Sequence, residues 1–315
     1  MHLLHVSACR PVSSQVDDCL TMPDTLSICF LGDRVEVRNP RLDDFLVEVA
    51  GADVKVTATG HRPFVCRATG QSADGRLVID SDTLFTLQLF NLHLASQKGN
   101  ALSLTRRQKA TVCLPVGTES ELADAMNCRA DSTGNACLYS KGSLIFTGGG
   151  TLGVTGNSRH AVGSSKNITI NDGHLIIYDT VKDGLHCDKL RMNGGTLTLH
   201  LARDASRGIR CKEAFTMKGG EISLRHDGAG GRCISVNGCT RIERGRLRLL
   251  STGRGGKGLN CSDSLFIGRR GDDFLPEDSL LLQVETRGWA IVDNVEEDKR
   301  EGCPKAIKCN NDLYI

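Results

Sequence analysis

The chain has 315 residues, enough for one large domain or two, and its 39 Lys and Arg nearly balance its 37 Asp and Glu. The net charge of +2 excludes a strongly basic or acidic chain and by itself indicates no partner class. Aromatic residues make up only 4%, and no segment keeps a 3.6-residue apolar period, which argues against helices. Short apolar alternation, as in residues 196–199, indicates half-buried strands instead.

Residues 1–24 are predicted to be a disordered tether or the remnant of a signal or lipoprotein segment. Met1–Cys9 is too short for a complete signal peptide. Val6–Cys9 nevertheless matches a bacterial lipoprotein processing box, in which Cys9 would be lipidated. The protein would then be exported and anchored at the bacterial cell surface. A chance match in a disordered tail is the alternative. No run of 18 apolar residues occurs, so no membrane span is expected.

Residues 25–315 are predicted to form one domain. Irregular apolar alternation over 25–100 indicates N-terminal coils and their cap, and 101–315 carries a more regular repeat, interrupted by a polar loop at 126–135. An insertion with Trp289 and an acidic run is expected near 286–303. The sequence ends on an apolar strand in the middle of a coil, which predicts a C-terminally truncated fragment because an open strand edge invites pairing.

The regular part repeats with a period of about 24 residues. A glycine opens one strand of each repeat, at Gly150, Gly173, Gly195, Gly220 and Gly245. A second alternating pair precedes each of these glycines by about seven residues. A third strand comes just before that and is marked by one inward aliphatic residue, at Leu185, Ile209, Ile234, Leu259 and Ile307.

Three short strands per repeat with glycine corners predict an all-β solenoid, specifically a right-handed parallel β-helix. Each coil satisfies its neighbour's backbone hydrogen bonds and buries one apolar ladder per face. The glycines fit corners that require a positive φ. A single chain of stacked coils buries its own core, and we expect a monomer.

The high cysteine count of 14 is partly explained by the same repeat. In the third strand, alternation places a cysteine inward two residues after the aliphatic residue. This predicts a column of reduced thiols that packs as small apolar side chains, with Val236 and Ser164 in the same register. The cysteines of this column are Cys187, Cys211, Cys261 and Cys309.

Five motifs in this order resemble the bacterial carbohydrate-binding-domain proteins, which fold as parallel β-helices similar in shape to pectate lyases. They are Ala136–Gly142, Gly150–Asn157, Arg159–Val162, Lys182–His186 and Pro304–Lys308. The resemblance covers residues 25–315. It implies binding of plant-type polysaccharide, including acidic polymers, with calcium in the fold. It does not imply catalysis, and we predict a non-catalytic binding protein. Where the family tends to repeat Asp-Gly at coil corners, this chain has it only at Asp183-Gly184 among the aligned corners.

The candidate binding residues lie in two rows in which cationic side chains recur from coil to coil. The corner row, two residues before each inward aliphatic residue, contains His160, Asp183, Arg207, Arg232, Lys257 and Lys305. The second row contains His186, Arg210, Ser235, Asn260 and Lys308. Residues 186–275 carry 17 Lys and Arg against 9 Asp and Glu. Because guanidinium groups pair carboxylates bidentately, Arg207, Arg210, Arg232, Lys257 and Lys305 are predicted to bind a uronate polymer.

Two alternatives explain the same rows differently. The cations could simply be a solvated face that blocks aggregation. They could also bind nucleic acid, although the interleaved aromatic residues that stack on bases are missing, and we expect no nucleic-acid partner.

Calcium is predicted at Asp183 and Asp188, with Asp179 and corner carbonyls as further oxygen ligands. The alternative is an Asp-Gly turn in which the carboxylate caps its own backbone. His160 and His186 are interpreted as members of stacked rows rather than metal ligands.

Three other functions remain open. A calcium-dependent, pectate-type lyase would need a base such as Arg207 or Arg210 beside Asp183. A hydrolase would need paired carboxylates, for which Asp204 and Asp227 are the candidates. A surface adhesin needs only the repeat architecture, and fold does not decide among these.

Overall fold

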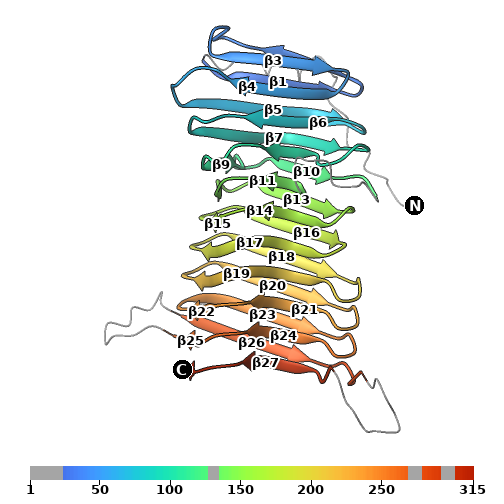
Figure 1. Cartoon of the computed structure of the whole chain (residues 1–315), viewed down its shortest axis with the longest axis vertical. Helices are drawn as coiled ribbons and strands as arrows, with labels where there is room; N and C mark the ends of the chain where they lie inside the picture. Colours follow the sequence, from blue (N-terminus) through green and yellow to red (C-terminus); the bar gives the residue numbers. More distant parts are fainter. Residues whose placement is uncertain (1–23, 127–134, 269–278, 292–301) are drawn as a thin grey trace, which may run out of the picture.

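The computed structural model describes residues 24–126, 135–268, 279–291 and 302–315. These residues form 28 strands of one continuous sheet that winds into a right-handed parallel β-helix (Figure 1), as the sequence predicts. No helix occurs in the described ranges, so none has the length and apolar character to cross a membrane. The predicted tether, with Cys9, lies outside them, as do residues 127–134 of the predicted polar loop.

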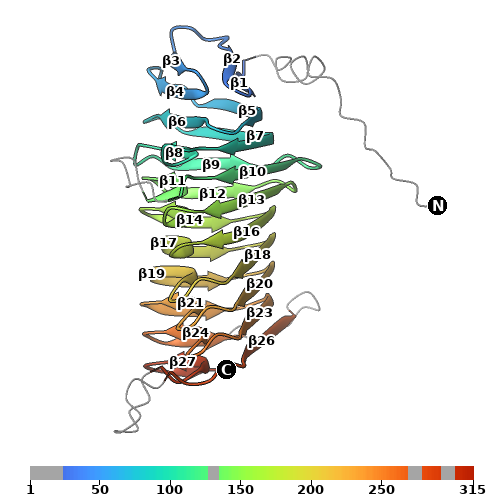
Figure 2. The same ribbon diagram turned by 90° about the vertical axis from the view of Figure 1, so that its right-hand side faces the viewer.

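Each coil contributes a strand to each of three faces, and Figure 2 shows faces 1 and 3 as two columns. Face 1 contains β4 (Asp53–Ala58), β6 (Arg76–Asp80), β8 (Leu102–Leu104), β11 (Ala136–Ser140), β14 (His160–Ser164), the first parts of β17 (Asp183–Met192) and β19 (Arg207–Met217), β21 (Arg232–Val236), β24 (Lys257–Cys261) and β27 (Lys305–Cys309).

Face 2 contains the first parts of β5 (Phe64–Ser72) and β7 (Phe85–Ala95), β9 (Ala110–Cys113), β12 (Leu144–Thr147), β15 (Asn167–Ile170), the last parts of β17 and β19, β22 (Cys239–Ile242), β25 (Leu265–Ile267) and β28 (Leu313–Tyr314). Face 3 contains the ends of β5 and β7, β10 (Glu119–Ala123), β13 (Thr151–Gly156), β16 (His174–Thr180), β18 (Thr196–Leu201), β20 (Glu221–His226), β23 (Gly245–Ser251) and β26 (Leu280–Thr286).

The inward side chains stack in register from coil to coil. Leu185, Ile209, Ile234, Leu259 and Ile307 pair successively along face 1, which confirms the predicted ladder. The first four are fully buried, whereas Ile307 is 37% exposed in the last described coil. Such apolar ladders on all three faces merge into one core cluster that runs from β1 (Leu26–Leu31) to β25.

The cysteine column is also confirmed in its packing. Cys187 pairs with Cys211, Val236 separates Cys211 from Cys261, and Cys309 follows Cys261. All four are free thiols, and all except Cys309 are buried. A valine within the column shows that volume rather than sulfur chemistry is what the position requires.

The corner glycines serve two purposes. Gly173, Gly195, Gly220 and Gly245 have the predicted positive φ, between 71° and 99°. Gly150 does not, and its constraint is space, because a Cβ atom there would overlap the carbonyl oxygen of Pro115.

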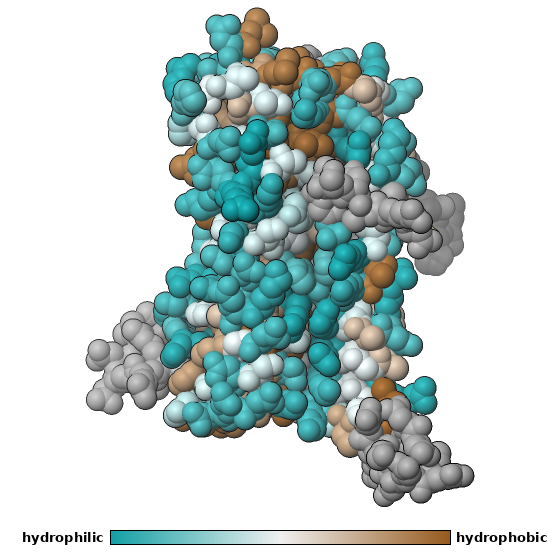
Figure 3. Space-filling model, in the orientation of Figure 1, coloured by the Kyte–Doolittle hydropathy of each residue, from teal (hydrophilic) through white to brown (hydrophobic). Residues whose placement is uncertain are grey.

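The N-terminal end, where the sequence predicts coils and their cap, contains two antiparallel strand pairs. β1 pairs antiparallel with β2 (Arg34–Arg38), and β3 (Phe45–Ala50) pairs antiparallel with β4. Antiparallel hairpins occupy strand edges that would otherwise be open for pairing. Hydrophobic side chains remain exposed here, including Leu46 at 56% and Val49 at 46%. Figure 3 shows hydrophobic surface near the N-terminal end and mostly hydrophilic surface over the later coils.

At the other end, the chain leaves the ladder between β26 and β27, where the insertion is predicted. Residues 292–301 of that segment lie outside the described ranges. Trp289 precedes them and is 83% exposed.

Candidate functional site

The corner row on face 1 has the register that the sequence predicts. Each member lies opposite the next across β14, β17, β19, β21, β24 and β27. Along the solenoid axis the row reads His160, Asp183, Arg207, Arg232, Lys257 and Lys305. Because adjacent strands lie about 4.8 Å apart, four successive coils each present one cation at that spacing.

The second row runs beside it in the same register, from His186 to Lys308. Its middle is less exposed than the sequence suggests. Ser235 is fully buried, and Arg210 donates a hydrogen bond from Nη1 to Ser235 Oγ at 3.0 Å. Burial and the neighbouring charges of Arg207 and Arg232 lower the pKa of Arg210. Part of this guanidinium is therefore engaged inside the face.

Asp183 is a buried anion at the start of the cationic row. Its side chain has no exposed surface, and its Oδ1 accepts a hydrogen bond from Arg207 Nε at 2.6 Å. The other oxygen, Oδ2, lies 2.7 Å from His186 Nδ1 and 3.2 Å from His160 Nδ1. Burial alone would raise the pKa of Asp183, but His160, His186 and Arg207 together hold it well below its usual range.

The two histidines close over this carboxylate as stacked rings. Their centroids are 4.4 Å apart at an interplanar angle of 27°. Burial lowers the pKa of His160, against the opposing influence of Asp183. The neutral imidazole of His160 is thus the form that the buried site favours.

The residues around Asp183 do not fit calcium. Within the described ranges, the group of three side chains whose ligand atoms lie within 4.8 Å of one another is His160, Asp183 and His186. Two imidazole nitrogens and a carboxylate already bound by a guanidinium are not the several hard oxygens that calcium takes.

The other predicted calcium ligands belong to separate ion pairs. Asp188 accepts from Lys212 Nζ at 3.1 Å, and Asp179 accepts from Arg203 Nε at 3.1 Å. Neither is a member of the three-residue group around Asp183.

The carboxylates considered for hydrolysis have partners of their own. Asp204 Oδ1 accepts from the backbone nitrogen of Ala229 at 2.8 Å. Asp227 forms side-chain hydrogen bonds with Thr252, Arg225 and His200. Burial would raise the pKa of Asp227, but these three hydrogen bonds lower it to about 2. Both act as structural acceptors on neighbouring coils.

The cations that follow Arg207 are not neutralised in this way. Within the described part of the chain, no carboxylate forms an ion pair with Arg232, Lys257, Lys305 or Lys308. Lys305 is exposed and the other three are partly exposed. Burial lowers the pKa of Lys257, and so do the positive charges of Arg232, Lys308 and Lys305. The last three described coils of face 1 therefore carry an uncompensated positive charge.

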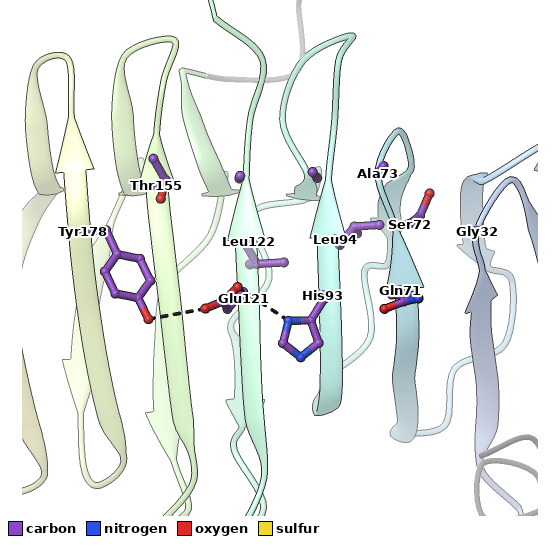
Figure 4. Close-up of a pocket in the computed structure, with 12 residues that line it drawn as sticks. Gly32, Gln71, Ser72, Ala73, His93, Leu94, Glu121, Leu122, Thr155 and Tyr178 are labelled. Atoms are coloured by element: carbon purple, nitrogen blue, oxygen red, sulfur yellow. Dashed lines mark hydrogen bonds and ion pairs between the residues drawn. The ribbon is translucent and has the colours of Figure 1, made fainter. Parts of the chain in front are cut away.

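A second candidate site, which the sequence analysis missed, lies on face 3 (Figure 4). A hollow of about 480 Å³, here called the aromatic hollow, is lined by outward side chains of β5, β7, β10 and β16. Tyr178 Oη donates to Glu121 Oε1 at 3.4 Å, and His93 Nδ1 lies 3.5 Å from Glu121 Oε2. Alternation places His93 and Glu121 outward, but no motif marks them, and nothing in the sequence links Tyr178 to residues two coils earlier.

Comparison with known proteins places these surfaces in a family. A solved structure described as the polysaccharide lyase-like protein from C. thermocellum, a gadolinium derivative, superposes with a TM-score of 0.60 over 93% of this chain and 97% of that one. Its sequence identity is 19%, so the similarity concerns the fold. A carbohydrate-binding domain-containing protein of Acetivibrio thermocellus is 26% identical over 137 residues, which are 42% of this chain and 46% of that protein.

The aligned part of the chain thus spans less than half the length of that relative. The family model described as carbohydrate-binding domain-containing protein matches residues 50–315, well over half of the chain. This match includes both rows of face 1 and the residues Gln71, His93, Glu121 and Tyr178 of the aromatic hollow. The chain belongs to the carbohydrate-binding domain-containing protein family.

Proposed function

We propose that the protein binds acidic polysaccharide, without cleaving it, along the C-terminal coils of face 1. The observation that carries this proposal is the run of Arg232, Lys257 and Lys305, which stand in register on successive strands without a carboxylate partner among the described residues. A uronate polymer presents carboxylates at regular intervals, so a periodic row of cations complements it along its length.

The two ends of the corner row have different tasks in this proposal. Arg207 is already paired with Asp183, and it closes the binding row at its N-terminal end. Arg210 and Lys308 flank the row from the second row. Arg232 contributes a planar fork of donors for bidentate contact, whereas Lys257 and Lys305 contribute compact charges.

Because the charges are at least partly exposed to solvent, the attraction is expected to depend on salt. The Debye length falls from about 10 Å at 0.1 M to about 3 Å at 1 M ionic strength, so binding should weaken strongly over that range. Polysaccharides of this kind occur outside cells, so we also propose that the protein is exported to the bacterial surface, with Cys9 as the anchoring residue.

The test is affinity electrophoresis in polygalacturonate gels with the double variant Arg232→Gln/Lys257→Gln. The variant should bind roughly tenfold more weakly, since two partly exposed charge contacts contribute about 0.7 kcal/mol each. The matched control is Arg191→Gln/Lys109→Gln, which removes the same charge from exposed positions outside the rows. Equal weakening in both variants, or none in either, would contradict the proposal.

Two further arms define the class of function. An ultraviolet assay for unsaturated products on polygalacturonate should show none, and product formation would identify a lyase instead. A single-stranded oligonucleotide should be retained less than polygalacturonate at equal ionic strength. Equal retention would mean that the row binds polyanions in general.

A further inference from the structure

The aromatic hollow is assembled by a departure from the regular repeat. Outward residues Gln71, His93, Glu121 and Gly153 lie in one continuous row across β5, β7, β10 and β13. The next strand, β16, then shifts register. Val154 pairs with Ile177 and Thr155 pairs with Asp179, so Tyr178 is an extra residue in a β-bulge. A bulge re-aims a side chain that alternation would direct elsewhere.

The absence of a side chain at Gly153 makes room for the ring of Tyr178. A Cβ atom on Gly153 would lie 2.5 Å from Tyr178 Cε2. The ring therefore extends over the neighbouring coil and reaches Glu121 on the coil beyond, as Figure 4 shows. The bulge and the glycine together create one exposed aromatic surface on a chain that has only three tyrosines.

Glu121 is held between Tyr178 and His93 but stays accessible. The side chains of His93 and Glu121 are 48% and 51% exposed, and Tyr178 is 47% exposed. Gln71 lines the same hollow and adds an amide. An aromatic surface bordered by a few oriented polar groups is the general form of a small-molecule site.

We propose that the aromatic hollow binds a neutral pyranose unit of a polysaccharide. The C–H face of the sugar would pack on Tyr178, and its hydroxyl groups would donate to Glu121 and exchange hydrogen bonds with His93 and Gln71. This site is separate from the cationic row, and it goes beyond the proposed function because its ligand has different chemistry.

The charge of the hollow selects against uronates. Glu119 lies on the same strand as Glu121, and burial together with the charges of these two glutamates raises the pKa of Tyr178. A sugar carboxylate would meet like charge here, which is unfavourable. Neutral hydroxyl groups instead find an acceptor that is already oriented. The two faces thus suit a polymer, or two polymers, with both neutral and acidic units.

The experiment is isothermal titration of the full chain with neutral β-1,4-linked hexaoses of xylose and of mannose. Wild type should bind at least one of them. Tyr178→Ala should weaken that binding at least tenfold, as for an aromatic residue at the centre of a site. Gly153→Ala keeps the tyrosine but displaces its ring, and it should weaken binding as well. Trp289→Ala, a control for loss of an exposed aromatic residue, should bind as wild type does.

Further arms separate this proposal from the one for face 1. Tyr178→Ala should retain wild-type thermal unfolding and wild-type binding of polygalacturonate, and Arg232→Gln/Lys257→Gln should retain binding of the neutral hexaose. Absence of neutral binding by wild type up to millimolar concentrations, or equal binding by Tyr178→Ala, would overturn the proposal. Tighter binding of a glucosamine hexaose than of either neutral hexaose would overturn the assigned sugar class.

Discussion

The cationic row of face 1 and the aromatic hollow of face 3 are built in opposite ways on the same solenoid. The row exists because Arg232, Lys257 and Lys305 occupy the same position of successive coils, and the parallel ladder superposes them. The hollow exists because β16 inserts one residue and breaks that superposition at Tyr178. Regular stacking yields extended surfaces of one chemical kind, whereas a local irregularity yields a site with mixed chemistry.

The largest expected effect comes from breaking the regular stack beneath the row. Cys211→Asp places an uncompensated carboxylate in a fully buried column and should lower the free energy of unfolding by several kcal/mol. Lys212→Gln, at the adjacent exposed position, should change it by about 0.5 kcal/mol or less. Thermal unfolding of both variants measures the difference. Similar midpoints would mean that these two positions face the same environment, contrary to the structure.

A smaller effect is expected where the row meets its buried anion. Asp183→Asn leaves the guanidinium of Arg207 without its charged partner and should cost about 2–3 kcal/mol, somewhat less than a fully buried pair because Arg207 is 20% exposed. Asp188→Asn removes an anion from a pair with Lys212, whose side chain is 49% exposed, and should cost under about 1 kcal/mol. Chemical denaturation of the two variants compares a buried ion pair with a surface one, and equal costs would contradict the burial of Asp183.

The pH dependence of stability should reflect two buried histidines. Burial lowers the pKa of His160 on face 1 and of His226 on face 3 below the value in the unfolded chain. At a pH between the folded and the unfolded pKa of such a histidine, the unfolded state binds more protons than the folded state. The free energy of unfolding should therefore fall as pH drops below about 6.5, by at most about 1.4 kcal/mol per pH unit for each histidine. Asp183, whose pKa is lowered, adds a further loss only in more acidic solution.

Thermal melts between pH 7 and 5 check this expectation. His226→Gln should reduce the slope, because the neutral ring of His226 accepts a hydrogen bond from the backbone nitrogen of Gly228 and also contacts Ser206. A midpoint that does not change over this pH range would show that neither histidine is held neutral.

The smallest expected effect on stability is at Gly153, which makes room for a binding side chain, in contrast to Gly142, which is packed against backbone. Gly153→Ala meets only the far end of the exposed Tyr178 side chain, so it should cost under about 0.5 kcal/mol while displacing the ring. In Gly142→Ala the new Cβ would overlap backbone oxygens of residues 107 and 108, which cannot yield in the same way. That variant should cost about 1–3 kcal/mol. Calorimetry compares the two, and a larger loss for Gly153→Ala would contradict the packing at the bulge.

The structural features that recur in every coil could be predicted from the sequence. Inward aliphatic residues, corner glycines and the order of the corner row all follow from residues recurring about every 24 positions. The bulge at Tyr178 was not predictable, because one extra residue within an apolar run of β16 leaves no compositional trace. The sequence predicts a cap over the N-terminal coils but not its antiparallel hairpins, since alternation does not distinguish parallel from antiparallel pairing.

Asp183 shows a different limit of sequence reasoning. Its Asp-Gly dipeptide is typical of an exposed turn and suggested a calcium ligand. Its burial depends on His160 from the preceding coil and Arg207 from the following one, so only the three-dimensional register reveals it.

The cysteine column has a practical consequence for how the solenoid comes apart. Only a thiolate reacts readily with alkylating reagents, and the hydrogen bond with Cys211 and burial raise the pKa of Cys187 well above its usual value. Cys187 should therefore be modified only when its own coil opens. In three variants, each keeping only one of Cys187, Cys211 and Cys261, the rate of alkylation would measure how often the coil that carries that cysteine opens. The column thus supplies built-in reporters for whether the solenoid frays from its ends or opens as a unit.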